Sequence, residues 1–257
     1  MNFLAKKAGR FFRPSPQARA LKRMPLEAIN HNFHIIPKLG IVYAAIPKVG
    51  CSMIKAALFR FHGDDTPKTM KQIHNVAGQP WEHVTDHGLA AMLERIGRRE
   101  LKAVAFVRNP YARVLSCYLN QFDTSGMKVI PEGFRARRKQ LLGDPDRVPT
   151  FDEFLDAVGR QSTYEMNGHW RPQAEQLLWG DISYDFVGRL ENFDEEIGRL
   201  SGIAGHDLEP YFHKESGTRF VSAGKRLGEF YTPDITEKVR RIYAADFEAF
   251  GYDTTLP

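Results

Sequence analysis

Ile41-Val-Tyr-Ala-Ala-Ile-Pro-Lys-Val-Gly-Cys-Ser-Met-Ile-Lys55 is the stretch that decides how this chain folds. A short run of β-branched and aromatic residues ends at Pro47, and a Lys-Val-Gly turn leads to Ser52, where a periodic apolar stretch begins. The order strand, tight loop and helix start leaves backbone N–H groups and the positive end of a helix dipole facing outward. The stretch therefore predicts a loop that receives an anion.

The side chains of this loop suit the same purpose. Lys48 and Lys55 supply cationic donors on either side of the helix start. Ser52 adds a hydroxyl, and Gly50 lets the backbone approach a phosphate closely. The loop is not the common nucleotide P-loop, in which the lysine follows the glycines in Gly-x-x-x-x-Gly-Lys-Ser/Thr. Taken alone, the segment also fits an ordinary strand–loop–helix connection with solvated lysines.

A second strand–helix connection lies further along the chain. Residues 103–107 are a near-continuous apolar run, as expected of a parallel strand that is buried on both faces. Arg108 ends this run, and Pro110 occupies the first position of the following helix. Ser116 lies about two turns into that helix, where it can face back toward the strand end. Taken alone, the segment fits an anion contact or a buried connector equally well.

Strand-like and helical segments alternate along the chain. The strand-like runs are 41–46, 103–107 and 184–188, and the helical stretches are 52–61, 110–121, 151–158, 193–201 and 234–249. Thr150 with Glu153, and Asn192 with Glu195, have the spacing of capping boxes. The alternation predicts an α/β fold of three layers, with a central parallel sheet flanked by helices in a P-loop-like arrangement. Ligands bind such sheets at the carboxyl ends of the strands, where both motifs lie.

Length and composition favour one domain with a short arm. A chain of 257 residues with 42% hydrophobic content can bury one substantial core. We expect residues 1–34 to form a basic N-terminal arm and residues 35–257 to form a single domain. Residues 125–149 are polar and contain Gly and Pro, so we expect a surface excursion there rather than a domain boundary.

Cysteine usage and hydropathy indicate the compartment. Cys51 and Cys117 lie inside the two motifs and make no disulfide framework, so we expect both to be reduced. No clustered Cys/His set is visible, and no metal is expected. No stretch approaches the roughly 20 apolar residues that cross a bilayer, and the first residues lack a signal-peptide core. We expect a cytoplasmic protein whose N-terminal arm is either a disordered tail or a peripheral contact with anionic lipid.

The two motifs resemble those of sulfotransferases that use 3′-phosphoadenosine 5′-phosphosulfate (PAPS). Pro47-Lys-Val-Gly-Cys-Ser52 is similar to their 5′-phosphosulfate loop, in the form carried by Golgi carbohydrate sulfotransferases. The segment from Arg108 to Ser116 resembles their 3′-phosphate site, Val-Arg-Asp-Pro-Phe-x-Arg-x-x-Ser. Asn109 stands where that pattern has Asp, which we interpret as a structural position. Two such motifs in the family's order are more than chance similarity would produce.

A third segment narrows the subfamily. His169-Trp-Arg-Pro-Gln173, residues 184–192 and the closing residues 242–252 resemble elements of carbohydrate sulfotransferases of the chondroitin/dermatan type. The resemblance spans roughly residues 35–252. Leu178 and Asp181 stand where these relatives carry cysteines. Together with the missing anchor, this difference is typical of a soluble, bacterial-like member.

The resemblance implies transfer of a sulfuryl group from PAPS to a hydroxyl of a carbohydrate by in-line displacement, with PAPS as co-substrate and no metal. It implies that PAPS is bound by Lys48, Val49, Gly50, Cys51, Ser52, Met53, Lys55, Arg108 and Ser116. Lys48 would also stabilise the charge that grows on the leaving 5′-phosphate. Arg135-Ala-Arg-Arg-Lys139 is a candidate contact for an acidic acceptor, with a solvated helix face as the alternative. No aromatic platform accompanies these basic residues, so nucleic-acid binding is not expected.

The acceptor hydroxyl needs a base near pH 7, and the natural candidates are histidine or, if no histidine serves, a carboxylate such as Glu82 or Asp86. His74, His83 and His87 lie between the two motifs, the interval that carries the catalytic histidine in heparan-type relatives. His87 is the first choice because it precedes a helix, 89–96, that leads into the strand ending at the arginine. His83 is the second, and His169 is a rival because His-Trp is a subfamily signature. Two other functions remain open: a phosphoryl-transfer enzyme with an atypical phosphate loop, and a non-catalytic glycan- or nucleotide-binding protein.

Overall fold

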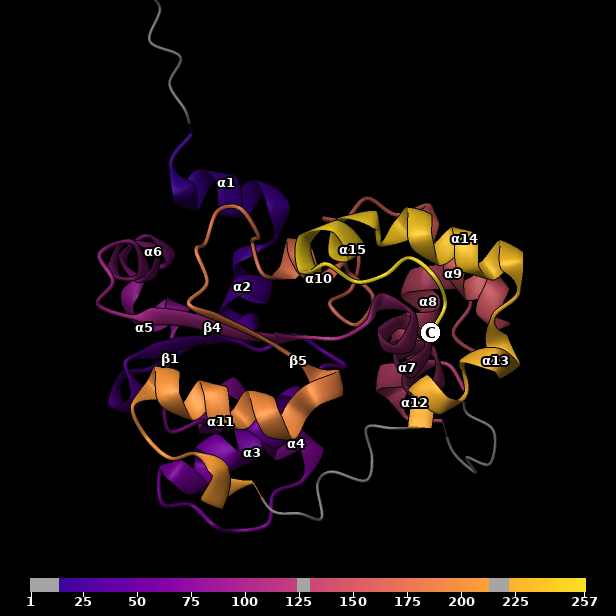
Figure 1. Cartoon of the computed structure of the whole chain (residues 1–257). Coiled ribbons are helices and arrows are strands. Elements are labelled where there is room, and N and C mark those ends of the chain that lie inside the picture. The colour runs from indigo at the N-terminus through magenta and orange to yellow at the C-terminus, as the bar shows by residue number, and fades with distance from the viewer. Residues whose placement is uncertain (1–13, 124–129, 213–221) are drawn as a thin grey trace, which may run out of the picture.

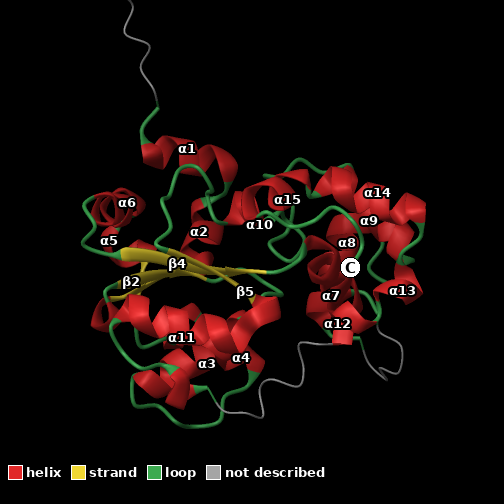
Figure 2. Ribbon diagram, in the orientation of Figure 1, coloured by secondary structure: helices red, strands yellow, loops and turns green. Residues whose placement is uncertain are grey.

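A five-stranded sheet forms the centre of the molecule (Figure 2). The computed structural model describes residues 14–123, 130–212 and 222–257. The sheet has the order β3-β1-β2-β4-β5. Its strands are β1 (Phe33–Ile36), β2 (Ile41–Ala44), β3 (Glu82–His83), β4 (Lys102–Val107) and β5 (Phe186–Arg189). Strands β2, β4 and β5 run parallel, whereas β1 runs antiparallel to both of its neighbours.

The parallel part of the sheet confirms the α/β fold that the apolar runs predict. Every residue of β2 is buried, as are the last five residues of β4. Val42 pairs with Ala103, and Val104 pairs with Phe186. Burial on both faces requires continuous apolar strands, and these two runs supply them. Strands β1 and β3 extend the sheet on the other side of β2 and were not predicted.

Helices cover both faces of the sheet (Figure 1). The helices of the N-terminal half are α1 (Pro16–Arg23), α2 (Leu26–Asn32), α3 (Cys51–Phe61), α4 (Met70–Ile73), α5 (Val84–His87), α6 (Leu89–Gly97) and α7 (Pro110–Gln121). Those of the C-terminal half are α8 (Glu132–Leu142), α9 (Phe151–Gly159), α10 (Gln173–Gln176), α11 (Phe193–Ala204), α12 (Ser222–Lys225), α13 (Leu227–Phe230), α14 (Pro233–Ile242) and α15 (Ala244–Phe250). Helices α3 and α11 lie on one face, and α1 and α2 on the other.

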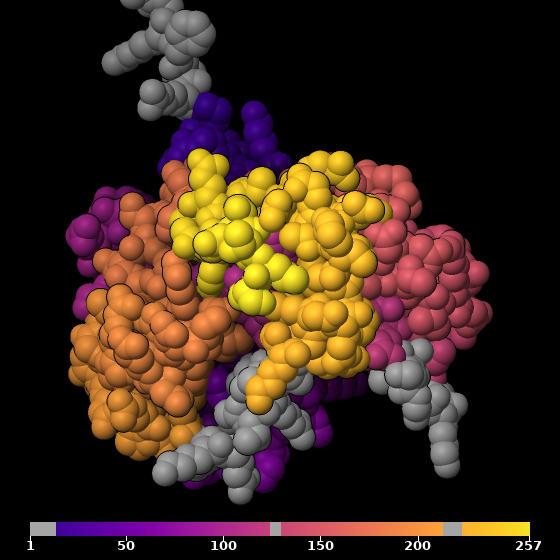
Figure 3. Space-filling model, turned by 45° about the vertical axis from the view of Figure 1, so that its right-hand side comes forward, coloured from indigo at the N-terminus to yellow at the C-terminus, as the bar shows by residue number. Residues whose placement is uncertain are grey.

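A second hydrophobic cluster lies beside the sheet, beyond the end of β4. Helices α7, α9, α14 and α15 contribute to it, and its largest fully buried side chain is Trp170. The length predicted one core, and the described residues form two. One surrounds the sheet, and the aromatic residues of these helices form the second. In the space-filling view, the C-terminal helices lie between the orange surface around α11 and the salmon surface of α8 and α9 (Figure 3).

The helix ends test the capping predictions. The Thr150 hydroxyl and the Glu153 carboxylate form the predicted capping box of α9. Asn192 makes no side-chain cap, because a 3₁₀ turn over Leu190–Asn192 leads into α11. The predicted helix over 234–249 is two helices that meet at Tyr243, whose φ of −110° departs from helical geometry. The Tyr243 hydroxyl donates to the Trp170 carbonyl oxygen at 2.8 Å, which ties this break to the second core.

Part of the segment assigned to the N-terminal arm packs against the domain. Ala20 and Met24 are fully buried, and Arg23 binds the carboxylates of Glu175 (2.9 Å) and Asp181 (3.0 Å). Asp181 also pairs with the Arg19 guanidinium, so this carboxylate anchors α1 to the domain. The predicted membrane contact falls on residues 1–13, outside the described residues. No helix within the described ranges is long and apolar enough to span a membrane.

Candidate functional site

A cleft of about 800 Å³ opens where β2 and β4 end. Its described lining is rich in cations, imidazoles, hydroxyls and amides: Lys48, Lys55, Arg108, Arg137, His31, His74, His169, Ser52, Ser116, Asn120 and Gln121. No Asp or Glu belongs to the lining formed by the described residues. A described lining that contains cations and no carboxylate gives the cleft a positive potential, so it is suited to an anionic ligand.

The loop after β2 has the backbone of an anion-binding nest. Lys48 and Gly50 both adopt left-handed conformations, with φ of 72° and 85°. Helix α3 makes its first backbone bond from the Met53 N–H to the Gly50 carbonyl oxygen, at 3.0 Å. The N–H groups before it remain at the positive end of the helix dipole. Eight of the nine residues predicted to bind PAPS line the cleft, and the ninth, Val49, is fully buried beneath the loop.

Two lysines face this cleft: Lys48 is half-buried, and Lys55 is fully buried. Burial lowers the pKa of Lys48, and the charges of Arg108 and Arg113 lower it further. Lys55 is only 1% exposed, and burial lowers the pKa of its ammonium to about 8. A lowered lysine pKa means that the surroundings penalise the charged form, and an anion placed nearby would remove that penalty. Both lysines are therefore poised to gain from an anionic ligand.

Arg108 joins the two predicted anion sites. Its Nη1 donates to the carbonyl oxygen of Lys48 at 3.3 Å, and Ser116 lines the same cleft from α7. Asn109, which replaces the family's Asp, caps α7 by accepting the Tyr111 N–H at 3.0 Å. This bond agrees with a structural role for that position. The strand end and the helix start thus present the arginine and the serine to one space.

The structural role of Arg113 was not predicted from the sequence. Its guanidinium is 1% exposed and donates to three carbonyl oxygens, those of Pro47 (3.2 Å), Arg171 (3.1 Å) and Gly168 (3.3 Å). These bonds fasten the loop after β2 to the segment that carries His169. The available signal was its position within the Arg-x-x-x-x-Arg-x-x-Ser pattern, one turn before the serine.

Two histidines in the cleft are held neutral. His74 Nε2 lies 2.8 Å from Ser52 Oγ, and burial together with Lys55 lowers the pKa of its imidazole to about 4. Burial lowers the pKa of His169 to about 3, and the charges of Arg137 and Lys48 contribute. A neutral imidazole can accept a proton, so both side chains are available as bases at pH 7.

The ring orientation of His169 is defined by Asn167. Asn167 Oδ1 accepts the backbone N–H of His169 at 3.1 Å and lies 2.8 Å from its Nδ1. Because the oxygen only accepts, the proton of the neutral ring is placed on Nδ1 and the lone pair on Nε2. His169 is therefore oriented as a proton acceptor.

The structure does not bring His87 or His83 into this cleft. His87 Nε2 lies 2.8 Å from Glu82 at the surface, and His83 is buried against the ring of His34. Neither belongs to the described lining of the cleft. The reason is the sheet order: β3, which leads into α5, lies at the edge, and β1 separates it from β2. His31, from the segment assigned to the arm, does line the cleft and stacks on His74 with ring centroids 6.4 Å apart.

The basic cluster of α8 divides between the cleft and the core. Arg137 lines the cleft, whereas Arg138 is fully buried and donates to the Phe122 carbonyl oxygen at 3.0 Å. Arg135 pairs with Asp146 at the surface. Within the described ranges, no group of three or more His, Cys, Asp or Glu side chains is arranged to hold a metal ion.

A mostly parallel sheet flanked by helices, with two cationic loops at its strand ends, defines a P-loop-like α/β protein. Within that class, the chain belongs to the sulfotransferase family, whose model matches residues 31–253. It is 22% identical to carbohydrate sulfotransferase 12 of Mus musculus over 91% of this chain and 62% of the relative. It is 24% identical to carbohydrate sulfotransferase 11 of Rattus norvegicus, over 82% of this chain and 64% of the relative.

Carbohydrate sulfotransferase 14 of Danio rerio is 26% identical over 82% of this chain and 59% of the relative. The chain thus spans about three fifths of the length of the curated relatives it matches. No solved structure matches it significantly.

Proposed function

We propose that this protein transfers the sulfuryl group of PAPS to a hydroxyl of a carbohydrate acceptor. Family membership and relatives named carbohydrate sulfotransferases support the reaction class. The observation that carries the proposal is the bond from the Arg108 guanidinium to the Lys48 carbonyl oxygen within one cleft. It brings two cationic loops to one space, which suits a nucleotide with anionic groups on both the 3′ and the 5′ positions of its ribose, as PAPS has.

The donor loop supports the leaving-group chemistry. Lys48 and the N–H groups at the start of α3 would contact the 5′-phosphosulfate, and Arg108 with Ser116 would contact the 3′-phosphate. As the bond between sulfur and the bridging oxygen breaks, negative charge grows on the 5′-phosphate. Fixed donors at that position lower the barrier without having to reorganise. In-line attack needs the acceptor hydroxyl on the opposite side of sulfur.

We assign the base to His169 in place of His87, since His169 lines the cleft and its Nε2 carries the lone pair. His74 is the second candidate, but its Nε2 already lies at the Ser52 hydroxyl. The pKa of His169 is about 3 with the cleft free of ligand, where cations surround it. A bound anionic donor would raise this pKa, because a nearby negative charge favours the imidazolium. We therefore expect the acid limb of kcat to lie at higher pH than that of kcat/KM.

The test is a transfer assay with PAPS and a panel of neutral and acidic saccharides, run with a chelator and again with magnesium. Sulfated product formed equally in both conditions is the expected result. Magnesium-dependent transfer of phosphate from a nucleotide would instead support the phosphoryl-transfer alternative. Tight binding of adenosine 3′,5′-bisphosphate without turnover on any acceptor would support a non-catalytic binding protein.

A further inference from the structure

The backbone of Arg108 has an unusual partner. Pairing of β4 with β5 ends at Val107, so Arg108 lies just past the last rung of that ladder. Its N–H donates to Gln173 Oε1 at 2.9 Å, and its carbonyl oxygen accepts Gln173 Nε2 at 2.8 Å. One side-chain amide thus satisfies both backbone groups, as a further rung of the sheet would.

Gln173 is itself held from the C-terminal helices. It is fully buried at the start of α10, and its backbone N–H donates to Asp246 Oδ2 at 2.9 Å. The N–H of Ala174 donates to the other carboxylate oxygen at 2.8 Å. Asp246 belongs to α15 and is also fully buried. Three segments far apart in the sequence therefore determine where the end of β4 lies.

We propose that Gln173, held by Asp246, is a positioning residue that sets Arg108 for the 3′-phosphate of the donor. The inference rests on the proposed role of Arg108 and extends it to two residues that touch no ligand. The Arg108 side chain is only 6% exposed, and its Nη1 is bonded to the Lys48 carbonyl oxygen. A guanidinium confined in this way reaches its ligand only from one backbone position, because charge-assisted hydrogen bonds weaken steeply with misalignment.

This arrangement also explains two parts of the sequence that the donor loops leave unused. The His-Trp-Arg-Pro-Gln segment carries both a candidate base, His169, and the amide of Gln173, and its Trp170 packs in the second core. The closing helix supplies Asp246. The bonds make the 3′-phosphate site dependent on the correct docking of the C-terminal helices.

The experiment compares the affinities of adenosine 3′,5′-bisphosphate and adenosine 5′-monophosphate by calorimetry in wild type and Gln173→Met. Methionine keeps the volume and removes both amide contacts. We expect the preference for the 3′-phosphorylated nucleotide to fall about tenfold, the scale on which loss of an orienting partner weakens a liganding group. The KM for PAPS should rise while kcat changes little. A purely structural role would lower the melting temperature and leave the preference intact.

Gln176→Met is the matched control, since Gln176 is equally buried in α10 and its amide donates to the Arg171 carbonyl oxygen at 2.8 Å rather than to Arg108. It should keep the wild-type preference. Asp246→Asn weakens the hold on Gln173 and makes no contact with Arg108. It should shift the preference in the same direction by a smaller factor. If Gln173→Met does not fold, Asp246→Asn tests the inference in its place. An unchanged preference in a folded Gln173→Met or Asp246→Asn protein overturns the inference. Absence of any 3′-phosphate preference in wild type would instead overturn the proposed function.

Discussion

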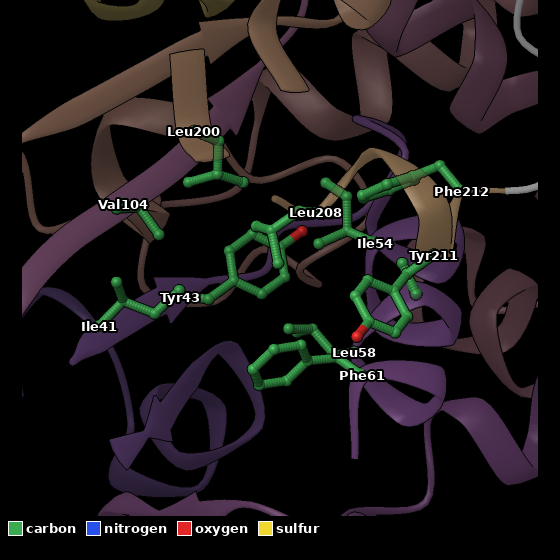
Figure 4. A pocket seen from close by; sticks show the side chains of 11 residues that line it. Ile41, Tyr43, Ile54, Leu58, Phe61, Val104, Leu200, Leu208, Tyr211 and Phe212 are labelled. Carbon is green, nitrogen blue, oxygen red and sulfur yellow. The ribbon is translucent and has the colours of Figure 1, made fainter. Parts of the chain in front are cut away.

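Helix α3 separates two hollows of opposite character. One face of the helix carries Ser52 and Lys55 into the polar cleft, and the other carries Ile54 and Leu58 into an apolar pocket (Figure 4). The apolar pocket has room for little more than one water, with a volume of about 20 Å³. Its one buried hydroxyl, that of Tyr43, has no hydrogen-bond partner among the described residues. A water needs two or more polar partners, so this pocket is unsuited to hydration.

The difference shows that the two faces of α3 have different roles. The apolar face fills space between α3, the sheet and α11, and substitutions there should change stability. The polar face leaves a lysine buried among histidines, which is unfavourable for folding and useful only with an anion present. Substitutions on the cleft side should therefore change binding and turnover more than they change stability.

The largest effect on the cleft side is expected from His169→Ala. Loss of the proposed base should lower kcat by about two to four decades, while affinity for adenosine 3′,5′-bisphosphate stays close to wild type. His87→Ala is the control and should turn over normally. The opposite result for the two variants would return the base to the position that the sequence predicted.

Lys48→Ala should raise the activation free energy of the single-turnover reaction by roughly 3–4 kcal/mol, because a donor at the leaving oxygen is lost. The melting temperature should not fall, since Lys48 is a half-buried cation with a lowered pKa and a left-handed backbone. A folded variant that retains the wild-type rate would remove Lys48 from the mechanism.

Leu58→Ala tests the apolar side. The side chain is 5% exposed and borders the small pocket, so truncation should cost about 2–3 kcal/mol of unfolding free energy by enlarging a cavity. Denaturant titration measures this loss, and kcat of the remaining folded enzyme should be unchanged. A large fall in kcat without a loss of stability would show that the two faces are not independent.

Arg108→Ala should weaken binding of adenosine 3′,5′-bisphosphate by roughly 1.5–3 kcal/mol, the range for a lost charge-assisted hydrogen bond. Binding of adenosine 5′-monophosphate should change far less, because that nucleotide lacks the 3′-phosphate. Calorimetry with both nucleotides makes the comparison. Equal losses for the two would place the arginine elsewhere on the donor.

Lys55→Met gives the smallest expected change, and its sign depends on pH. Burial lowers the native pKa of Lys55 to about 8, below its value in the unfolded chain, so the unfolded state binds more protons above pH 8. Wild-type stability should therefore gain between about pH 8 and 10.5 relative to the variant. Below pH 8 the wild type carries the full cost of burying this charge, so the variant should be the more stable there. Thermal unfolding of both proteins across this pH range measures the difference. If their stabilities depend on pH in the same way, Lys55 is not a buried charge with a lowered pKa.

The parallel strands and the two cationic loops that follow them could be predicted because their signals are local. A buried parallel strand followed by Lys-Val-Gly, or by Arg-Asn-Pro, is readable within fifteen residues. The position of His87 was not readable, since it depends on the antiparallel strand β1, whose short run Phe33–Ile36 was divided between arm and domain. Sheet order is a non-local property, and no spacing in the sequence carried it.

His31 and Gln173 illustrate the same limit from the other direction. Their chemistry is ordinary, and only the folded chain shows that one stacks on His74 and the other holds Arg108. The second core had a visible signal in the aromatic residues of α7 and α9. The sequence did not show that these residues pack together around Trp170.

The left-handed backbone of Lys48 has a consequence for the evolution of this fold. A lysine with φ of 72° is disfavoured by roughly 1–2 kcal/mol relative to glycine, which adopts that region freely. Lys48→Gly should therefore raise stability in the same step that removes the proposed catalytic cation. Selection for thermal resistance alone would drive the site toward glycine. Backbone conformation thus favours glycine at this position, and the proposed sulfuryl transfer is what favours lysine.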